Sequence, residues 1–149
     1  MFQTFIFTKM ADQQKIFALR LNPGDDLKRS LASFVSANNI RAGYIITAVG
    51  SLSTCNLRYA GQANGVIIPE RFEILSLSGT LCLQGLHLHI ALADANGKTI
   101  GGHLLDGNII YTTAEIVIGE ASRLLFNRIA DAKTGYPELV VKSANDQGS

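Results

Sequence analysis

The apolar positions that follow the turn at residues 22–25 recur with the spacing of an α-helix. Asp25 stands directly before this stretch and is a residue type that caps helix N-termini well. The apolar stripe consists of Leu27, Leu31, Phe34 and Val35, at positions i, i+4, i+7 and i+8. We therefore predict an amphipathic helix that begins after Asp25, ends near Ala37 and packs on a sheet.

Most of the remaining chain shows the short apolar runs of β-strands, separated by turn residues. The predicted strands span residues 5–7, 15–21, 43–50, 55–59, 73–83, 86–93, 100–104, 109–118 and 124–126. The run at 43–50 lacks clean alternation, which is typical of a strand covered on both faces. Residues 60–69 and 133–141 are predicted loops, and residues 142–149 are predicted to form a frayed polar tail.

One early helix among many strands with short turns indicates the α+β class. We expect a mainly antiparallel sheet with the helix packed on it. The length of 149 residues suits a single domain over residues 1–149, long enough to bury a core.

All three histidines of the chain lie in the predicted hairpin of residues 86–104. Because side chains alternate between the two faces of a strand, His87 and His89 share one face. The other face is large and apolar and is predicted to be core; it consists of Leu86, Leu88, Ile90 and Leu92. Small residues follow the histidines on their own face and leave room above the rings.

The turn between the two strands decides whether His103 joins the other two histidines. Asn96-Gly97 is a strong hairpin signal. A two-residue loop would turn His103 to the core face. A three-residue loop, with Asp94 paired with Lys98, sets His103 directly opposite His89. We predict the three-residue loop, or another register of the same parity.

Two glycines, Gly101 and Gly102, precede His103 and leave one alternative open. A β-bulge at this point would shift the register of the hairpin. Paired glycines in a strand mark either such a bulge or close packing against a neighbouring backbone.

Three imidazoles on one sheet face form an all-nitrogen ligand set for a divalent first-row metal, zinc above all. We predict that His87, His89 and His103 are metal ligands, with a fourth position open to water or substrate. The alternative is that they are ordinary polar residues on a half-exposed face.

Glu115 is the only charged residue in the apolar run at 109–118. A carboxylate in such a run is costly unless it is paired or functional. As a candidate catalytic residue, Glu115 could orient a ligand histidine, serve as a fourth ligand or act as a general base. Alternatively, it faces solvent or an arginine such as Arg58 or Arg123.

Composition adds limits to the function. The net charge of +1 and the scattered basic residues produce no broad field that would recruit nucleic acid. An apolar share of 47% with few charges suits a chain that hides surface in an oligomer. Cys55 and Cys82 fit no metal or redox motif and are expected to be buried thiols. No segment reaches membrane-spanning length and no signal peptide is evident, so we expect no membrane association and a cytoplasmic location.

Several separated motifs resemble the PPC domain, the plant and prokaryote conserved domain, over about residues 14–140. They are residues 21–26, 48–52, 57–59 and 72–80, the His87-Leu88-His89 pair, Gly101-Gly102-His103 and residues 112–115. The resemblance implies a largely antiparallel α/β domain that assembles as a homotrimer, in a family often labelled as predicted DNA-binding. Plant members add AT-hook motifs of the form Arg-Gly-Arg-Pro, which this chain lacks. Prokaryotic members of the stand-alone type keep the histidine set, which supports His87, His89 and His103 as metal ligands.

These observations favour a stand-alone prokaryotic PPC protein: a homotrimer with a three-histidine divalent metal site near a subunit boundary. One alternative is a metal-dependent enzyme that acts on a small molecule, although no nucleophile motif or phosphate-binding loop names a substrate. Another is a DNA-associated module, in which a trimer gathers Arg20, Lys28, Arg29 and Arg41 into a basic patch. A third is a structural or regulatory trimer that binds no DNA.

Overall fold

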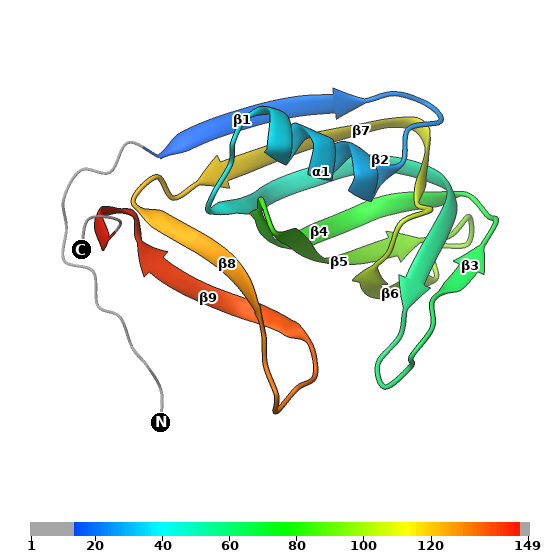
Figure 1. Ribbon diagram of the computed structural model, residues 1–149. Coiled ribbons are helices and arrows are strands. Elements are labelled where there is room, and N and C mark those ends of the chain that lie inside the picture. The colour runs from blue at the N-terminus through cyan, green and yellow to red at the C-terminus, as the bar shows by residue number, and fades with distance from the viewer. Residues whose placement is uncertain (1–13, 147–149) are drawn as a thin grey trace.

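The computed structural model describes residues 14–146 of the chain, so the predicted strand at residues 5–7 lies outside the described part. Within these residues there is one α-helix, α1 (Leu27–Ala37), which lies between β1 and β2 in sequence. The strands are β1 (Lys15–Leu21), β2 (Gly43–Arg58), β3 (Val66–Ile68), β4 (Phe72–Cys82), β5 (Gly85–Ala93), β6 (Thr99–Leu104), β7 (Ile109–Glu120), β8 (Leu124–Ala130) and β9 (Pro137–Ser143), followed by a 3₁₀ turn at Ala144–Asp146 (Figure 1). The α+β class with an antiparallel sheet is confirmed.

Helix α1 has the predicted stripe but a different cap. Leu27, Leu31 and Val35 are buried, as their spacing predicts, and Phe34 is partly buried against the core. The N-cap is Asp26 rather than Asp25, because the Asp26 side chain accepts hydrogen bonds from the backbone N–H groups of Lys28 and Arg29. Asp25 instead accepts from the Asn22 N–H within the preceding turn, at 2.8 Å.

Strand β2 is one 16-residue strand, where the sequence predicted two with a break at Gly50-Ser51. Its pairing with β7 shifts register between Ile45 and Thr47 and again between Gly50 and Leu52, so bulges bend the strand without ending it. The expectation that both faces of this stretch are covered is wrong for the single chain, because Val49 is 53% exposed.

Two predicted loops contain strands. Residues 66–68 of the predicted 60–69 loop form β3, which pairs with β2. Residues 137–143, assigned to a loop and to the start of the tail, form β9, which pairs with β8 in a separate two-stranded sheet. In both cases the short polar-flanked run becomes a strand because a partner strand satisfies its backbone hydrogen bonds.

The large sheet has seven strands in the order β1-β7-β2-β4-β5-β6, with β3 attached to β2. Strand β6 also pairs with the far end of β2, so that β2, β4, β5 and β6 close a ring. The hydrophobic core lies between the inner face of this sheet and α1. It includes Leu31, Leu57, Leu88, Leu104 and Ile116.

Cys55 and Cys82 are both free and buried, as expected from their positions in apolar runs. Among residues 14–146, no helix has the length and apolar character needed to cross a membrane.

Candidate metal centre

The hairpin of β5 and β6 carries all three histidines and has the predicted register. Asp94 N donates to Lys98 O at 3.0 Å and Gly97 N donates to Asp94 O at 3.0 Å, which leaves a three-residue loop. Gly97 has the left-handed φ of 77° that this loop requires. His89 is therefore paired directly with His103. The predicted three-residue loop is confirmed.

The glycines before His103 do not form a bulge. The pairing of β5 with β6 runs without interruption through Gly101 and Gly102. A Cβ atom on Gly102 would lie 2.9 Å from the carbonyl oxygen of Arg58, closer than such atoms normally approach. The glycines therefore serve close packing of β6 against its two neighbouring strands, the second of the two readings of this motif.

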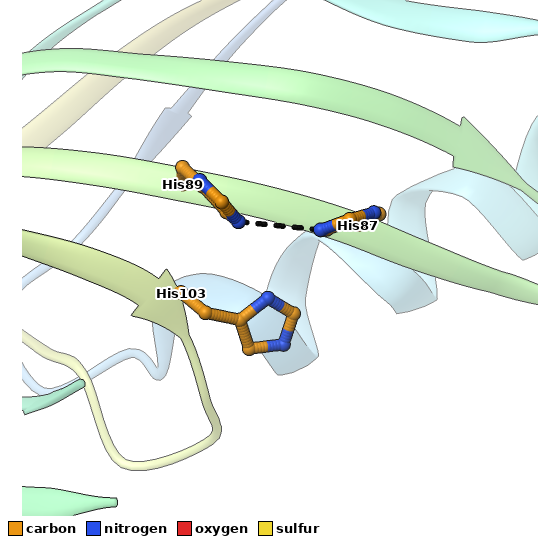
Figure 2. Close-up of side chains that lie close together, drawn as sticks. All are labelled: His87, His89 and His103. Atoms are coloured by element: carbon orange, nitrogen blue, oxygen red, sulfur yellow. Dashed lines mark hydrogen bonds between the residues drawn. The ribbon is translucent and has the colours of Figure 1, made fainter. Parts of the chain in front are cut away.

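The three imidazoles converge on one region of space (Figure 2). The Nε2 atoms of His87 and His89 are 3.2 Å apart. The ring centroid of His103 lies 5.2 Å from that of His87 and 5.5 Å from that of His89. One nitrogen of each ring can be chosen so that all three lie within 4.8 Å of one another. The parity argument from the sequence therefore places all three rings on one face of the sheet.

Strand β4 supports the histidine strand from the side opposite β6. Thr80 is paired with His87, and Ser78 with His89. Gly79, between them, has φ of 143°, and a Cβ atom there would collide with the carbonyl oxygen of His87. This glycine allows β4 to approach β5 at the level of the two histidines.

The surroundings favour neutral imidazoles. Burial lowers the pKa of His103 to about 4, and the Arg58 guanidinium adds to this effect. Partial burial also lowers the pKa of His87, helped by His89 and Arg128 and opposed by Glu138. Neutral imidazole has a free lone pair, so these two side chains are in the form that binds a metal at neutral pH.

His103 also has an unsatisfied nitrogen. Its Nδ1 is buried and has no hydrogen-bond partner among the described residues. A buried polar atom without a partner is uncommon in folded proteins and calls for an explanation such as an ion. His87 and His89 are exposed and His103 is half-buried, so solvent reaches the group.

Glu115 does not join the histidines. It lies on β7 opposite Arg20 and Val49, and β2 and β4 stand between β7 and β5 in the sheet. Arg58, one of its considered partners, instead lies opposite His103. The His87, His89 and His103 group contains no carboxylate. Within one chain, Glu115 is therefore separated from the histidines.

The sequence analysis missed two arginines that the fold brings to the histidines. Arg58 is paired with His103 at the closure of the sheet. Arg128 lies on β8, and its Nη2 donates to the hydroxyl of Thr80, the residue paired with His87. Neither relationship has a local signal in the sequence, because each joins elements that are far apart in the chain.

Comparisons with known proteins agree with this fold. The Plants and Prokaryotes Conserved (PCC) domain, the family abbreviated PPC above, matches residues 8–122. Bifunctional protein GlmU from Synechococcus sp. (strain JA-3-3Ab) is 49% identical over 128 residues, which is 86% of this chain and 21% of that protein. The chain thus spans about a fifth of the length of this relative.

Two solved structures share the architecture over 91% of this chain. A hypothetical protein from Salmonella enterica is 43% identical, with a TM-score of 0.86 and 98% of its own chain covered. A protein from Archaeoglobus fulgidus, described as metal-containing, is 28% identical, with a TM-score of 0.75 and 99% of its chain covered. With the match to residues 8–122 of 149, these findings establish that the chain belongs to the Plants and Prokaryotes Conserved domain family.

Proposed function

We propose that this PCC-domain protein binds one divalent first-row metal ion per chain, zinc above all, through His87, His89 and His103. The observation that carries the proposal is the convergence of three imidazole nitrogens to within 4.8 Å of one another. The metal-containing relative from Archaeoglobus fulgidus supports the assignment.

The donor set fits such an ion. Zinc binds imidazole nitrogen at about 2.0–2.1 Å, so two ligands of a tetrahedral site lie ~3.3 Å apart. The Nε2 atoms of His87 and His89 are 3.2 Å apart, close to that separation. A hydrogen bond between the two rings would explain this pair alone. It would leave unexplained the unpartnered Nδ1 of His103 beside them.

We further propose that the protein is a homotrimer, the assembly implied by its family. Exposed apolar side chains on the outer face of the sheet support an interface between copies. Ile46 and Val49 on β2 are 48% and 53% exposed, and Leu75 on the neighbouring β4 is 54% exposed. Water contact at such side chains is unfavourable, and assembly would remove it.

A bound ion of this kind can polarise a carbonyl group or activate water, so a metal-dependent reaction on a small molecule is a second candidate function. The observation that favours it is a cavity lined by His87 and His103. The residues that line this cavity would position a ligand, and the metal ion would act as the Lewis acid.

Elemental analysis of protein purified without a polyhistidine tag tests the metal assignment. We expect about one equivalent of zinc per chain in the wild type and a large loss in a His89→Ala variant. If the variant also unfolds, the metal has a structural role. If the variant keeps its thermal stability, the metal serves binding or catalysis. Wild-type protein that takes up no zinc or other first-row metal would overturn the proposal.

A further inference from the structure

A cavity of about 240 Å³ lies between the histidine strands and the β8–β9 hairpin. We call it the hairpin cavity. Its polar lining consists mainly of Arg58, His87, His103, Arg128, Tyr136 and Glu138. Two candidate metal ligands therefore share one cavity with two guanidinium groups.

One N–H donor of Arg128 has no hydrogen-bond acceptor within the described residues. Its Nη2 donates to the Thr80 hydroxyl, which fixes the guanidinium beside His87. Its Nε is buried and has no hydrogen-bond partner among residues 14–146. A buried N–H without an acceptor destabilises the protein unless a ligand or water satisfies it.

Arg58 is held in place on the other side of the cavity. Its Nη1 donates to the Tyr136 hydroxyl at 3.3 Å, and its guanidinium carbon lies 5.3 Å from the centre of that ring. Its backbone is paired with His103. Within the described part of the chain, no carboxylate forms an ion pair with Arg58 or with Arg128.

The charges in the hairpin cavity do not balance. Two guanidinium groups face one carboxylate, that of Glu138. A divalent ion on the histidines would add two further positive charges. Arginine side chains present several N–H donors in a planar fork that matches a carboxylate or a phosphate, so this lining suits a small anion.

We propose that the hairpin cavity binds a small carboxylate-bearing molecule, whose carboxylate contacts Arg128 and Arg58 beside the three histidines. This inference depends on the proposed metal site in one respect only, namely that a metal ion would lie next to the bound carboxylate. The volume of 240 Å³ is below the roughly 300–1,000 Å³ of drug-sized sites, so the ligand has few carbon atoms.

Isothermal titration calorimetry with malonate tests the inference, with malonamide as the uncharged analogue and inorganic phosphate as a different anion. Both zinc-loaded and metal-free protein are titrated, and metal content is measured before and after.

We expect malonate to bind and malonamide not to bind. Arg128→Gln and Arg58→Gln should each weaken malonate binding about ten- to hundredfold, since a hydrogen bond to a charged group contributes about 1.5–3 kcal/mol. Arg20→Gln, which removes the same charge from a residue outside the cavity lining, should bind as the wild type does.

The outcomes separate this inference from the metal proposal. Zinc uptake without malonate binding, or equal binding by the wild type and both arginine variants, overturns the hairpin cavity as a carboxylate site. Tighter binding of phosphate than of malonate overturns the carboxylate class. Binding that depends on Arg128 in a protein that takes up no metal overturns the metal site and leaves the cavity proposal standing. Circular dichroism checks folding, and if Arg128→Gln unfolds, Arg128→Lys and Arg58→Gln decide the question.

Discussion

His89 lies directly opposite His103 in the pairing of β5 with β6. The three-residue loop at 95–97 sets this relationship, because a loop shorter by one residue would reverse the facing of every side chain on β6. The Asp94 carboxylate holds the loop through hydrogen bonds from the N–H groups of Asn96 and Lys98 at 2.8 Å and 2.9 Å. The metal assignment therefore depends on the register of one hairpin.

Replacing His103 should remove most of the zinc affinity. His103→Gln removes one of the three imidazole ligands. Loss of a residue that only hydrogen-bonds a metal ligand already lowers metal affinity about 10–100-fold, so loss of the ligand itself should cost more. We expect the dissociation constant for zinc to rise at least about hundredfold in a competition titration with a chromophoric chelator. Thr99→Ala, at an exposed position of the same strand, is the control and should bind as the wild type does. Equal affinity in the two variants would contradict the assignment.

Gly79→Ala should destabilise the protein and loosen the metal site together. The new methyl group would collide with the His87 carbonyl oxygen and push β4 away from β5. We expect the free energy of unfolding to fall by more than about 1 kcal/mol, since the backbone at this position also disfavours alanine. Gly61→Ala is the matched control, because Gly61 has φ of 70° but open space around it. Urea denaturation of both variants measures the difference, and equal losses would count against this reading of Gly79.

The Cys55 thiol should be inert in the folded protein. Burial raises its pKa to about 11, from a reference value of 9.0. Folding thus favours the protonated thiol, so its contribution to stability is complete below pH 9 and is lost as the pH rises from about 9 through about 11. In a Cys82→Ser background, we expect iodoacetamide to label Cys55 at pH 8 only after unfolding, as measured by mass spectrometry. Rapid labelling of the native protein would contradict this prediction.

The assembly should depend on the outer face of β2 and β4. Leu75→Glu places a charge among the exposed apolar side chains of that face. We expect the wild type to sediment as a trimer and this variant as a monomer, because burying an unpaired carboxylate in an interface is costly. Leu83→Glu is the control: Leu83 is 48% exposed but lies in the turn between β4 and β5. A monomeric wild type would refute the trimer.

DNA association should be weak at most. Two of the basic residues considered for a patch are already near carboxylates: Arg29 Nε lies 3.1 Å from Asp106 Oδ2, and Lys28 Nζ lies 4.0 Å from Asp106 Oδ1. We expect little retention on a DNA column at low salt and none at physiological salt, since phosphate contacts weaken steeply as salt rises. Strong retention at low salt that Arg20→Gln or Arg41→Gln reduces would favour the DNA-associated module instead.

Periodicity predicted the parts of the fold that depend on neighbours in sequence. The stripe of Leu27, Leu31 and Val35 predicted the buried face of α1. The loop residues around Gly97 predicted the hairpin and thus the convergence of the histidines. The cap at Asp26 was displaced by one residue because two adjacent aspartates compete, and the turn uses Asp25.

The remainder depends on contacts between distant segments. Strand β2 continues through Gly50 because bulges against β7 absorb the irregularity, which the sequence of β2 alone does not reveal. Strand β9 exists because β8 pairs with it, and the same hairpin brings Arg128 to Thr80. For this reason the histidines could be predicted from the sequence, whereas the arginines beside them could not.

The pairing of Arg58 with His103 closes the ring of β2, β4, β5 and β6. The third histidine thus sits on a strand that has a hydrogen-bonded neighbour on each side, β5 and β2. Amide protons near His103 should accordingly exchange with solvent only when the whole ring opens. Folding already holds the three imidazole nitrogens close together, so binding of a metal ion would require little further loss of conformational entropy.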